Sequence, residues 1–126
     1  MKSVLVVDDD PDLRLLVQNR LEKNSYVVRT ACDGIDALRK IKSHRPDLIV
    51  LDALMPNMDG YTFIQEIKYQ EPFKDIPVMI FTGKADLKRI FEMEGIRHFV
   101  DKPFNSEEFM KKVRTILDDS LSAGTA

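Results

Sequence analysis

The sequence predicts an α/β protein with a doubly wound, five-stranded parallel sheet and five helices. Short apolar, β-branched runs alternate along the chain with segments whose apolar residues recur at helical spacing. Repeated strand–helix units favour a parallel sheet with right-handed crossovers and helices on both of its faces. The length of 126 residues fits one domain of this class.

Five segments have the length and composition of strands. They are residues 3–7, 26–30, 47–51, 78–81 and 98–100. The first, third and fourth are nearly continuous apolar runs, which is typical of central strands that are buried on both faces. The second and fifth carry polar residues at their ends, so we expect them at the edges of the sheet.

Apolar stripes at helical spacing indicate five helices between and after these strands. The stripes are Leu13, Leu16, Val17 and Leu21; Ile35, Leu38 and Ile41; Phe63, Ile64 and Ile67; Leu87, Ile90 and Phe91; and Phe109, Val113, Ile116 and Leu117. Asp10 and Asp33 are predicted N-caps of the first two helices. Asn105 and Glu108 resemble a capping box for the last helix.

Composition restricts the class of protein. With 44% hydrophobic residues, a net charge of −2 and no apolar run of about 20 residues, the chain is expected to be cytoplasmic, with no membrane contact. The absence of a basic block argues against direct nucleic-acid binding. The single cysteine, Cys32, excludes an internal disulfide and is expected to be a small buried hydrophobic residue. We expect a domain of residues 1–119 and a C-terminal tail of residues 120–126.

Polar and charged residues follow four of the predicted strands. They are Asp8, Asp9 and Asp10; Asp52; Thr82 and Gly83; and Lys102 and Pro103. Ligands of open parallel sheets bind outside the carboxyl ends of the strands, so we expect these groups to share one site. A hard divalent cation such as Mg²⁺, or the ammonium group of Lys102, could offset the repulsion among the carboxylates. Carboxylates, Mg²⁺, a lysine and a hydroxyl together are typical of phosphoryl transfer.

Four segments carry a family resemblance. They are Val4–Pro11, Pro46–Gly60, Ile80–Gly83 and Phe99–Phe104. Together, in this order and at this spacing, they resemble the receiver domain of bacterial two-component response regulators, of the chemotaxis-regulator type. The resemblance implies a flavodoxin-like receiver fold with strand order 2-1-3-4-5.

The resemblance also implies roles for individual residues. Asp52 would be the phosphoacceptor. Asp8, Asp9 and Asp52, with the backbone carbonyl of Leu54, would hold Mg²⁺. Lys102 would contact the phosphoryl group.

Further implied roles concern the switch and the shape of the site. Thr82 would turn toward a phosphoryl oxygen after modification, and Phe99 would change rotamer as Thr82 moves. Gly83 would leave space for the phosphoryl group. The implied structural residues at the site are Pro56, Gly60 and Pro103, the last of which would place Lys102.

The function that follows from the resemblance is signalling. The chain would take a phosphoryl group from the phosphohistidine of a sensor histidine kinase or a phosphotransfer protein. It would catalyse its own phosphorylation and slow dephosphorylation, and change conformation to regulate an unidentified protein target or relay phosphate. Phosphorylation could also drive homodimer formation. The apolar Leu54 cannot orient an attacking water, so we expect it to slow dephosphorylation.

Two alternatives remain open from the sequence. The first is a haloacid-dehalogenase-like phosphohydrolase with Asp8 as its nucleophile, because Asp8 and Asp10 form an Asp-x-Asp pair after the first strand. The second is a pseudo-receiver that binds partners without turning over phosphate. The chain could also be excised from a longer regulator or hybrid kinase.

Overall fold

The fold contains the predicted five strands and five helices. The computed structural model describes residues 2–53, 59–70, 72–83, 85–101 and 105–125, with the backbone alone described for residues 85 and 118–125. The strands are β1 (Ser3–Val7), β2 (Val27–Ala31), β3 (Leu48–Asp52), β4 (Val78–Thr82) and β5 (His98–Asp101). The helices are α1 (Pro11–Lys23), α2 (Gly34–Ser43), α3 (Gly60–Lys68), α4 (Ala85–Met93) and α5 (Ser106–Thr125).

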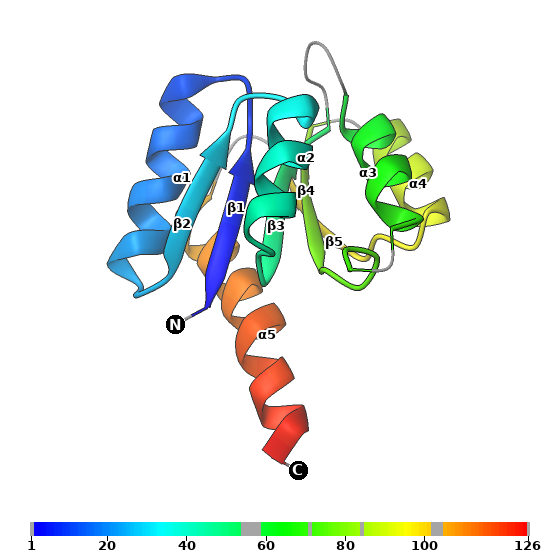
Figure 1. Ribbon diagram of the computed structural model, residues 1–126. Coiled ribbons are helices and arrows are strands. Elements are labelled where there is room, and N and C mark those ends of the chain that lie inside the picture. Colours follow the sequence, from blue (N-terminus) through cyan, green and yellow to red (C-terminus); the bar gives the residue numbers. More distant parts are fainter. Residues whose placement is uncertain (1, 54–58, 71, 84, 102–104, 126) are drawn as a thin grey trace.

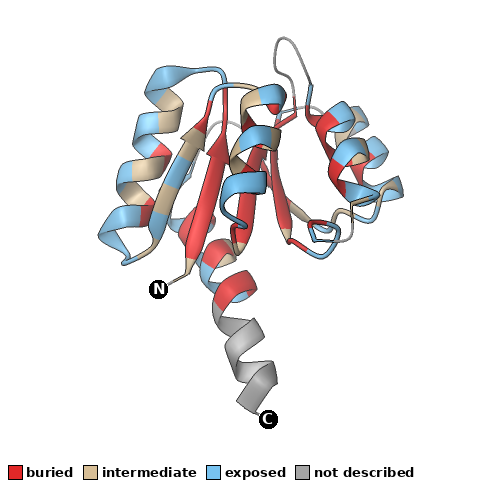
Figure 2. Cartoon of the chain, viewed as in Figure 1, coloured by how far each residue is buried: buried red, intermediate tan, exposed pale blue. Residues whose placement is uncertain are grey.

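The sheet has the order β2-β1-β3-β4-β5, and every neighbouring pair is parallel, which confirms the predicted topology (Figure 1). Every residue of β1, β3 and β4 is buried, as expected for the centre of a parallel sheet (Figure 2). The first four residues of β2 alternate between exposed and partly buried, as expected for an edge, and Ala31 at its end is buried. The carboxyl ends of all the strands therefore lie at one end of the sheet.

Two hydrophobic cores form, one on each face of the sheet. Helices α1 and α5 bury apolar side chains on one face, and α2, α3 and α4 do so on the other. The first core includes Val17, Leu21, Phe109 and Val113, and the second includes Ala37, Ile41, Phe63, Ile67 and Phe91. Burial on both faces holds the strand ends rigidly, which is what a site at the end of the sheet needs.

The predicted helix caps are confirmed. A carboxylate oxygen of Asp10 accepts hydrogen bonds from the backbone N–H groups of Asp12 and Leu13. The carboxylate of Asp33 caps α2 in the same way. The amide oxygen of Asn105 accepts a hydrogen bond of 3.0 Å from the backbone N–H of Glu108 at the start of α5. These interactions satisfy N–H groups that have no partner within the helix.

Some expected details differ from the structure. Leu16, Ile35 and Ile90 are exposed although they belong to the predicted stripes, because the faces that meet the sheet are centred on other positions. Cys32 is exposed, contrary to the burial predicted from the sequence, because β2 ends at Ala31 and the chain turns there into α2.

Helix α5 extends through most of the segment predicted as a tail, to Thr125. The division into a domain of residues 1–119 and a tail of 120–126 stays a prediction. None of the helices in the described part of the chain combines the length and hydropathy that a membrane crossing requires.

Candidate functional site

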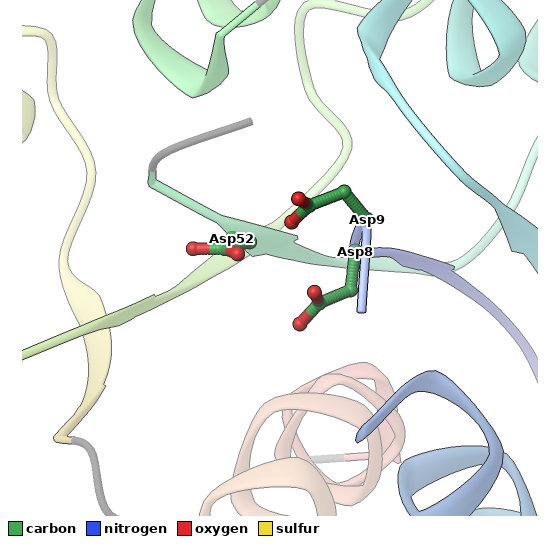
Figure 3. Close-up of side chains that lie close together, drawn as sticks. All are labelled: Asp8, Asp9 and Asp52. Carbon is green, nitrogen blue, oxygen red and sulfur yellow. The ribbon is translucent and has the colours of Figure 1, made fainter. Parts of the chain in front are cut away.

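Three carboxylates meet at the carboxyl ends of β1 and β3. One oxygen each of Asp8, Asp9 and Asp52 can be chosen so that all lie within 4.8 Å of one another (Figure 3). Asp8 and Asp52 are buried, at 3% and 5% exposure, whereas Asp9 is exposed. Adjacent strands of a parallel sheet bring these residues together although the acidic pair and Asp52 are far apart in the sequence. The predicted grouping of these acids is therefore correct.

Hydrogen bonds hold Asp8 in place on three sides. Its backbone N–H donates to the carbonyl oxygen of Ala31 at 3.1 Å, which extends the β1–β2 pairing by one residue. Its carboxylate Oδ1 accepts a hydrogen bond of 2.9 Å from the backbone N–H of Asp10. The Nη1 atom of Arg14 donates a hydrogen bond of 2.7 Å to the backbone carbonyl oxygen of Asp8. The backbone that carries the acidic pair is thus fixed from β2, from the loop and from α1.

Arg14 is not among the site residues predicted from the sequence. A signal for it was present, because side chains in the first turns of a helix point back toward the helix N-terminus. Arg14 lies in the first turns of α1, so its side chain can reach the end of β1.

Asp10, the third acid after β1, has a different role. Asp10 is the N-cap of α1, and its Oδ1 accepts from the N–H of Asp12 at 2.9 Å and from that of Leu13 at 3.3 Å. Its carboxylate is therefore engaged with the helix, which leaves Asp8 and Asp9 as the acidic pair that faces Asp52.

The charge and chemistry of the cluster fit a hard cation. Carboxylates this close repel one another, and the burial of Asp8 and Asp52 reduces screening of that repulsion by water. A divalent cation would relieve it, and oxygen ligands of this kind suit Mg²⁺, which keeps part of its water shell. The cluster can therefore hold a metal ion.

The end of β3 packs tightly against the start of α3. The backbone N–H of Ala53 donates to the carbonyl oxygen of Phe81 on β4 at 3.1 Å, and the N–H of Gly60 donates to the carbonyl oxygen of Ala53 at 3.3 Å. A β-carbon on Gly60 would lie 2.9 Å from the backbone oxygen of Asp52. Glycine is thus required here by a close backbone approach, which supports its predicted structural role.

The predicted switch residues lie on the two strands beyond β3. Thr82 ends β4, is 4% exposed, and pairs with Asp101 at the end of β5. Gly83 follows it and is exposed. Phe99 pairs with Ile80 and is 7% exposed. Thr82 therefore ends the strand next to the one that carries Asp52, and Phe99 lies one strand further along.

Four predicted site residues lie outside the described residues. They are Leu54, Pro56, Lys102 and Pro103. Their roles stay predictions from the resemblance.

Comparison with known proteins gives one consistent result. A family model described as "Response regulator receiver domain" matches residues 4–114. The hybrid signal transduction histidine kinase D of Dictyostelium discoideum is 37% identical over 131 residues, which cover 95% of this chain and 8% of that protein. The alkaline phosphatase synthesis regulator PhoP of Bacillus subtilis is 36% identical over 118 residues, covering 92% of this chain and 48% of PhoP.

The structural comparison agrees. The response regulator TrrA of Thermotoga maritima, solved in complex with Mg²⁺ and BeF, has a TM-score of 0.82 and 33% identity, covering 92% of this chain and 99% of that one. This chain spans less than half of the length of both curated relatives.

Proposed function

This chain belongs to the response regulator receiver domain family, and we propose that it accepts a phosphoryl group on Asp52 in a Mg²⁺-dependent reaction. Membership of this family implies a histidine kinase or phosphotransfer protein as its partner. The observation that carries the proposal is the cluster of Asp8, Asp9 and Asp52 at the carboxyl ends of neighbouring central strands. The family match favours this function over the phosphohydrolase alternative.

The reaction is a transfer between two nucleophiles. A carboxylate oxygen of Asp52 attacks the phosphorus of a phosphohistidine. The new P–O bond forms as the P–N bond breaks, and the electron pair of the P–N bond returns to the leaving imidazole. The buried position of Asp52 excludes much of the water that would compete for the phosphoryl group.

The metal would be held by Asp8, Asp9, Asp52 and the carbonyl oxygen of Leu54. Bound Mg²⁺ would supply neutralisation of the charge that develops on the phosphoryl oxygens. The ammonium group of Lys102 would neutralise part of the same charge. Arg14 supports this arrangement by its hydrogen bond to the Asp8 backbone.

The phosphorylated form would favour a second conformation. A new phosphoryl group on Asp52 offers the hydroxyl of Thr82 a strong acceptor, and movement of Thr82 changes the space available to Phe99. The ratio of the two conformations changes only as far as the phosphoryl group makes more favourable contacts in one than in the other. We propose that this shift regulates binding of a downstream protein, relays phosphate or promotes a homodimer.

The decisive experiment is intact-mass spectrometry after incubation with Mg²⁺ and acetyl phosphate. We expect wild type to gain the mass of one phosphoryl group, and Asp52→Asn or wild type with EDTA to gain none. Folding of both proteins is checked by circular dichroism. No gain in folded wild type would support the pseudo-receiver alternative. A gain that persists in Asp52→Asn would place the phosphate elsewhere, with Asp8 as the first candidate.

A second prediction concerns the lifetime of the phosphorylated form. Leu54 lies two positions after the acceptor, and its apolar side chain cannot orient a water molecule. We expect Leu54→Asn to shorten the lifetime because an amide can hold a water for attack on phosphorus. Loss of the phosphoryl group is followed by mass spectrometry after the donor is removed, with Leu54→Met as the control. An unchanged or longer lifetime in Leu54→Asn contradicts this prediction.

A further inference from the structure

Strand β2 lies at an edge of the described sheet, with β1 on its inner side. Alternate residues of β2 bond to β1, as the N–H of Val27 does to the carbonyl oxygen of Lys2 at 3.0 Å. The backbone groups of the residues between them point away from β1, because successive residues of a strand bond to opposite sides. These residues are Val28, Thr30 and, just after the strand, Cys32. Such an edge is a template for pairing with another strand.

Two side chains of α2 occupy the outward groups at the carboxyl end of this edge. The Nζ atom of Lys40 donates a hydrogen bond to the carbonyl oxygen of Thr30. The Oδ2 atom of Asp36 accepts a hydrogen bond of 3.2 Å from the backbone N–H of Cys32. The Lys40 Nζ and Asp36 Oδ2 atoms are 3.3 Å apart and form an ion pair. Helix α2 thus covers two outward groups of β2 with one ion pair.

These two hydrogen bonds are the ones that a further parallel strand would make at this position. In a parallel sheet, a residue donates its N–H to the residue before its partner and accepts from the residue after its partner. A residue placed opposite Ala31 on the outer side would therefore donate to Thr30 and accept from Cys32. Lys40 and Asp36 take the places of that donor and that acceptor.

The carboxylate of Asp36 is held firmly in this position. Its Oδ1 atom accepts a hydrogen bond of 2.7 Å from Nη2 of Arg39, and its side chain is 14% exposed. The hydrogen bond from Arg39 first, and then those from Cys32 and Lys40, hold the pKa of the Asp36 carboxyl below its ordinary value. The carboxylate is therefore anionic at neutral pH. A strand that paired here would have to displace the ion pair, and charged groups on an edge oppose such pairing.

We propose that the Asp36–Lys40 ion pair closes the edge of β2 and so prevents a second copy of this chain from pairing with it. A second copy is the occupant to exclude, because two identical edges can join about a twofold axis. With the ion pair in place, the outward groups that remain on β2 are those of Val28 and the N–H of Thr30. This inference goes beyond the proposed function and does not depend on phosphorylation.

The simpler explanation is that the two hydrogen bonds only fasten α2 to β2, so that their loss lowers stability without causing association. The double variant Asp36→Ala, Lys40→Met removes both bonds, whereas Lys40→Arg keeps the donor. Lys42→Met, at an exposed position of the same helix, is the matched control for a lost charge and an added methionine. Thr30→Pro, added to the double variant, removes an outward N–H that β1 does not use and so blocks pairing at the edge.

The test is sedimentation velocity over a range of protein concentrations. EDTA is present and no phosphodonor is added, so that phosphorylation does not contribute, and a reducing agent is included because Cys32 is exposed. We expect the double variant to self-associate at least about tenfold more tightly than wild type, since each copy gains hydrogen-bonding partners from the other. Lys40→Arg, Lys42→Met and the triple variant with Thr30→Pro are expected to match wild type. A folded double variant that associates no more tightly than wild type would overturn the proposal.

Hydrogen exchange followed by NMR identifies the surface that associates. In the double variant, the amides of Val28 and Thr30 should exchange more slowly as the protein concentration rises. Association without this protection uses another surface and also overturns the proposal. If circular dichroism shows that the double variant does not fold, Lys40→Met is tested alone, and association equal to that of wild type again overturns it.

Discussion

Replacing Asp9 with asparagine is expected to weaken Mg²⁺ binding at least about tenfold. Asp9 is exposed, so its side chain contributes little to the core, but one of its oxygens lies within 4.8 Å of oxygens of Asp8 and Asp52. A divalent cation and a carboxylate about 4 Å apart attract each other by about 2 kcal/mol even at the dielectric constant of water, a factor of roughly 30 in affinity. An amide retains an oxygen ligand but removes this attraction.

The same substitution, which weakens Mg²⁺ binding, should slightly stabilise the metal-free protein. Loss of one charge removes repulsion from Asp8 and Asp52, so we expect the free energy of unfolding in EDTA to rise slightly. Mg²⁺ affinity is measured by NMR titration and stability by urea denaturation. Asp12→Asn, which removes an exposed acid of α1 outside the cluster, is the matched control. Equal Mg²⁺ affinities of the two variants would rule out Asp9 as a ligand.

Replacing Gly60 with alanine is expected to impair both stability and phosphorylation. The new β-carbon would lie 2.9 Å from the backbone oxygen of Asp52, 3.1 Å from that of Ala53 and 3.2 Å from the Ala53 α-carbon. These are backbone atoms, so they can yield only if the end of β3 moves. Overpacking of this kind costs about 1–3 kcal/mol, which exceeds the gain of about 0.4–1 kcal/mol from restricting the unfolded chain.

The chemical consequence follows from the position of the clash. Any shift that makes room for the new β-carbon moves the backbone of Asp52, the proposed acceptor. A misplacement of about 1 Å can slow a reaction by about a hundredfold, so we expect labelling by acetyl phosphate to be about ten- to a hundredfold slower in Gly60→Ala. Urea denaturation and the rate of mass gain are measured on the same samples.

Gly95 offers a matched control for this prediction. It has a φ of +90°, and a β-carbon there would meet nothing within 4 Å. Gly95→Ala should therefore lose about 1–2 kcal/mol through backbone strain alone and should keep a normal labelling rate. If both variants label as fast as wild type, the contact between Gly60 and the end of β3 has no part in the reaction.

Local sequence patterns correctly predicted the central strands, the acidic cluster and the helix caps. Nearly continuous apolar runs identified the central strands, and β1, β3 and β4 are indeed buried throughout. Acids placed directly after such runs identified the cluster, because the carboxyl ends of parallel strands share one end of the sheet. Asp10 and Asp33 were recognised as caps because capping depends only on neighbouring backbone groups.

The errors concern the rotation of helices and the course of turns. Leu16, Ile35 and Ile90 continue apolar stripes yet are exposed, since the sequence does not specify which part of a broad stripe meets the sheet. Cys32 is exposed because β2 ends one residue before it, at Ala31, where the chain leaves the sheet.

The sequence by itself therefore determined the class of fold, the order of its elements and the acids of the candidate site. All of these depend on periodicity and on residues a few positions apart. Only the tertiary structure placed Arg14 against the Asp8 backbone and Gly60 against the end of β3. The reason is that each of these contacts joins separate elements, and its geometry depends on how whole helices pack against the sheet.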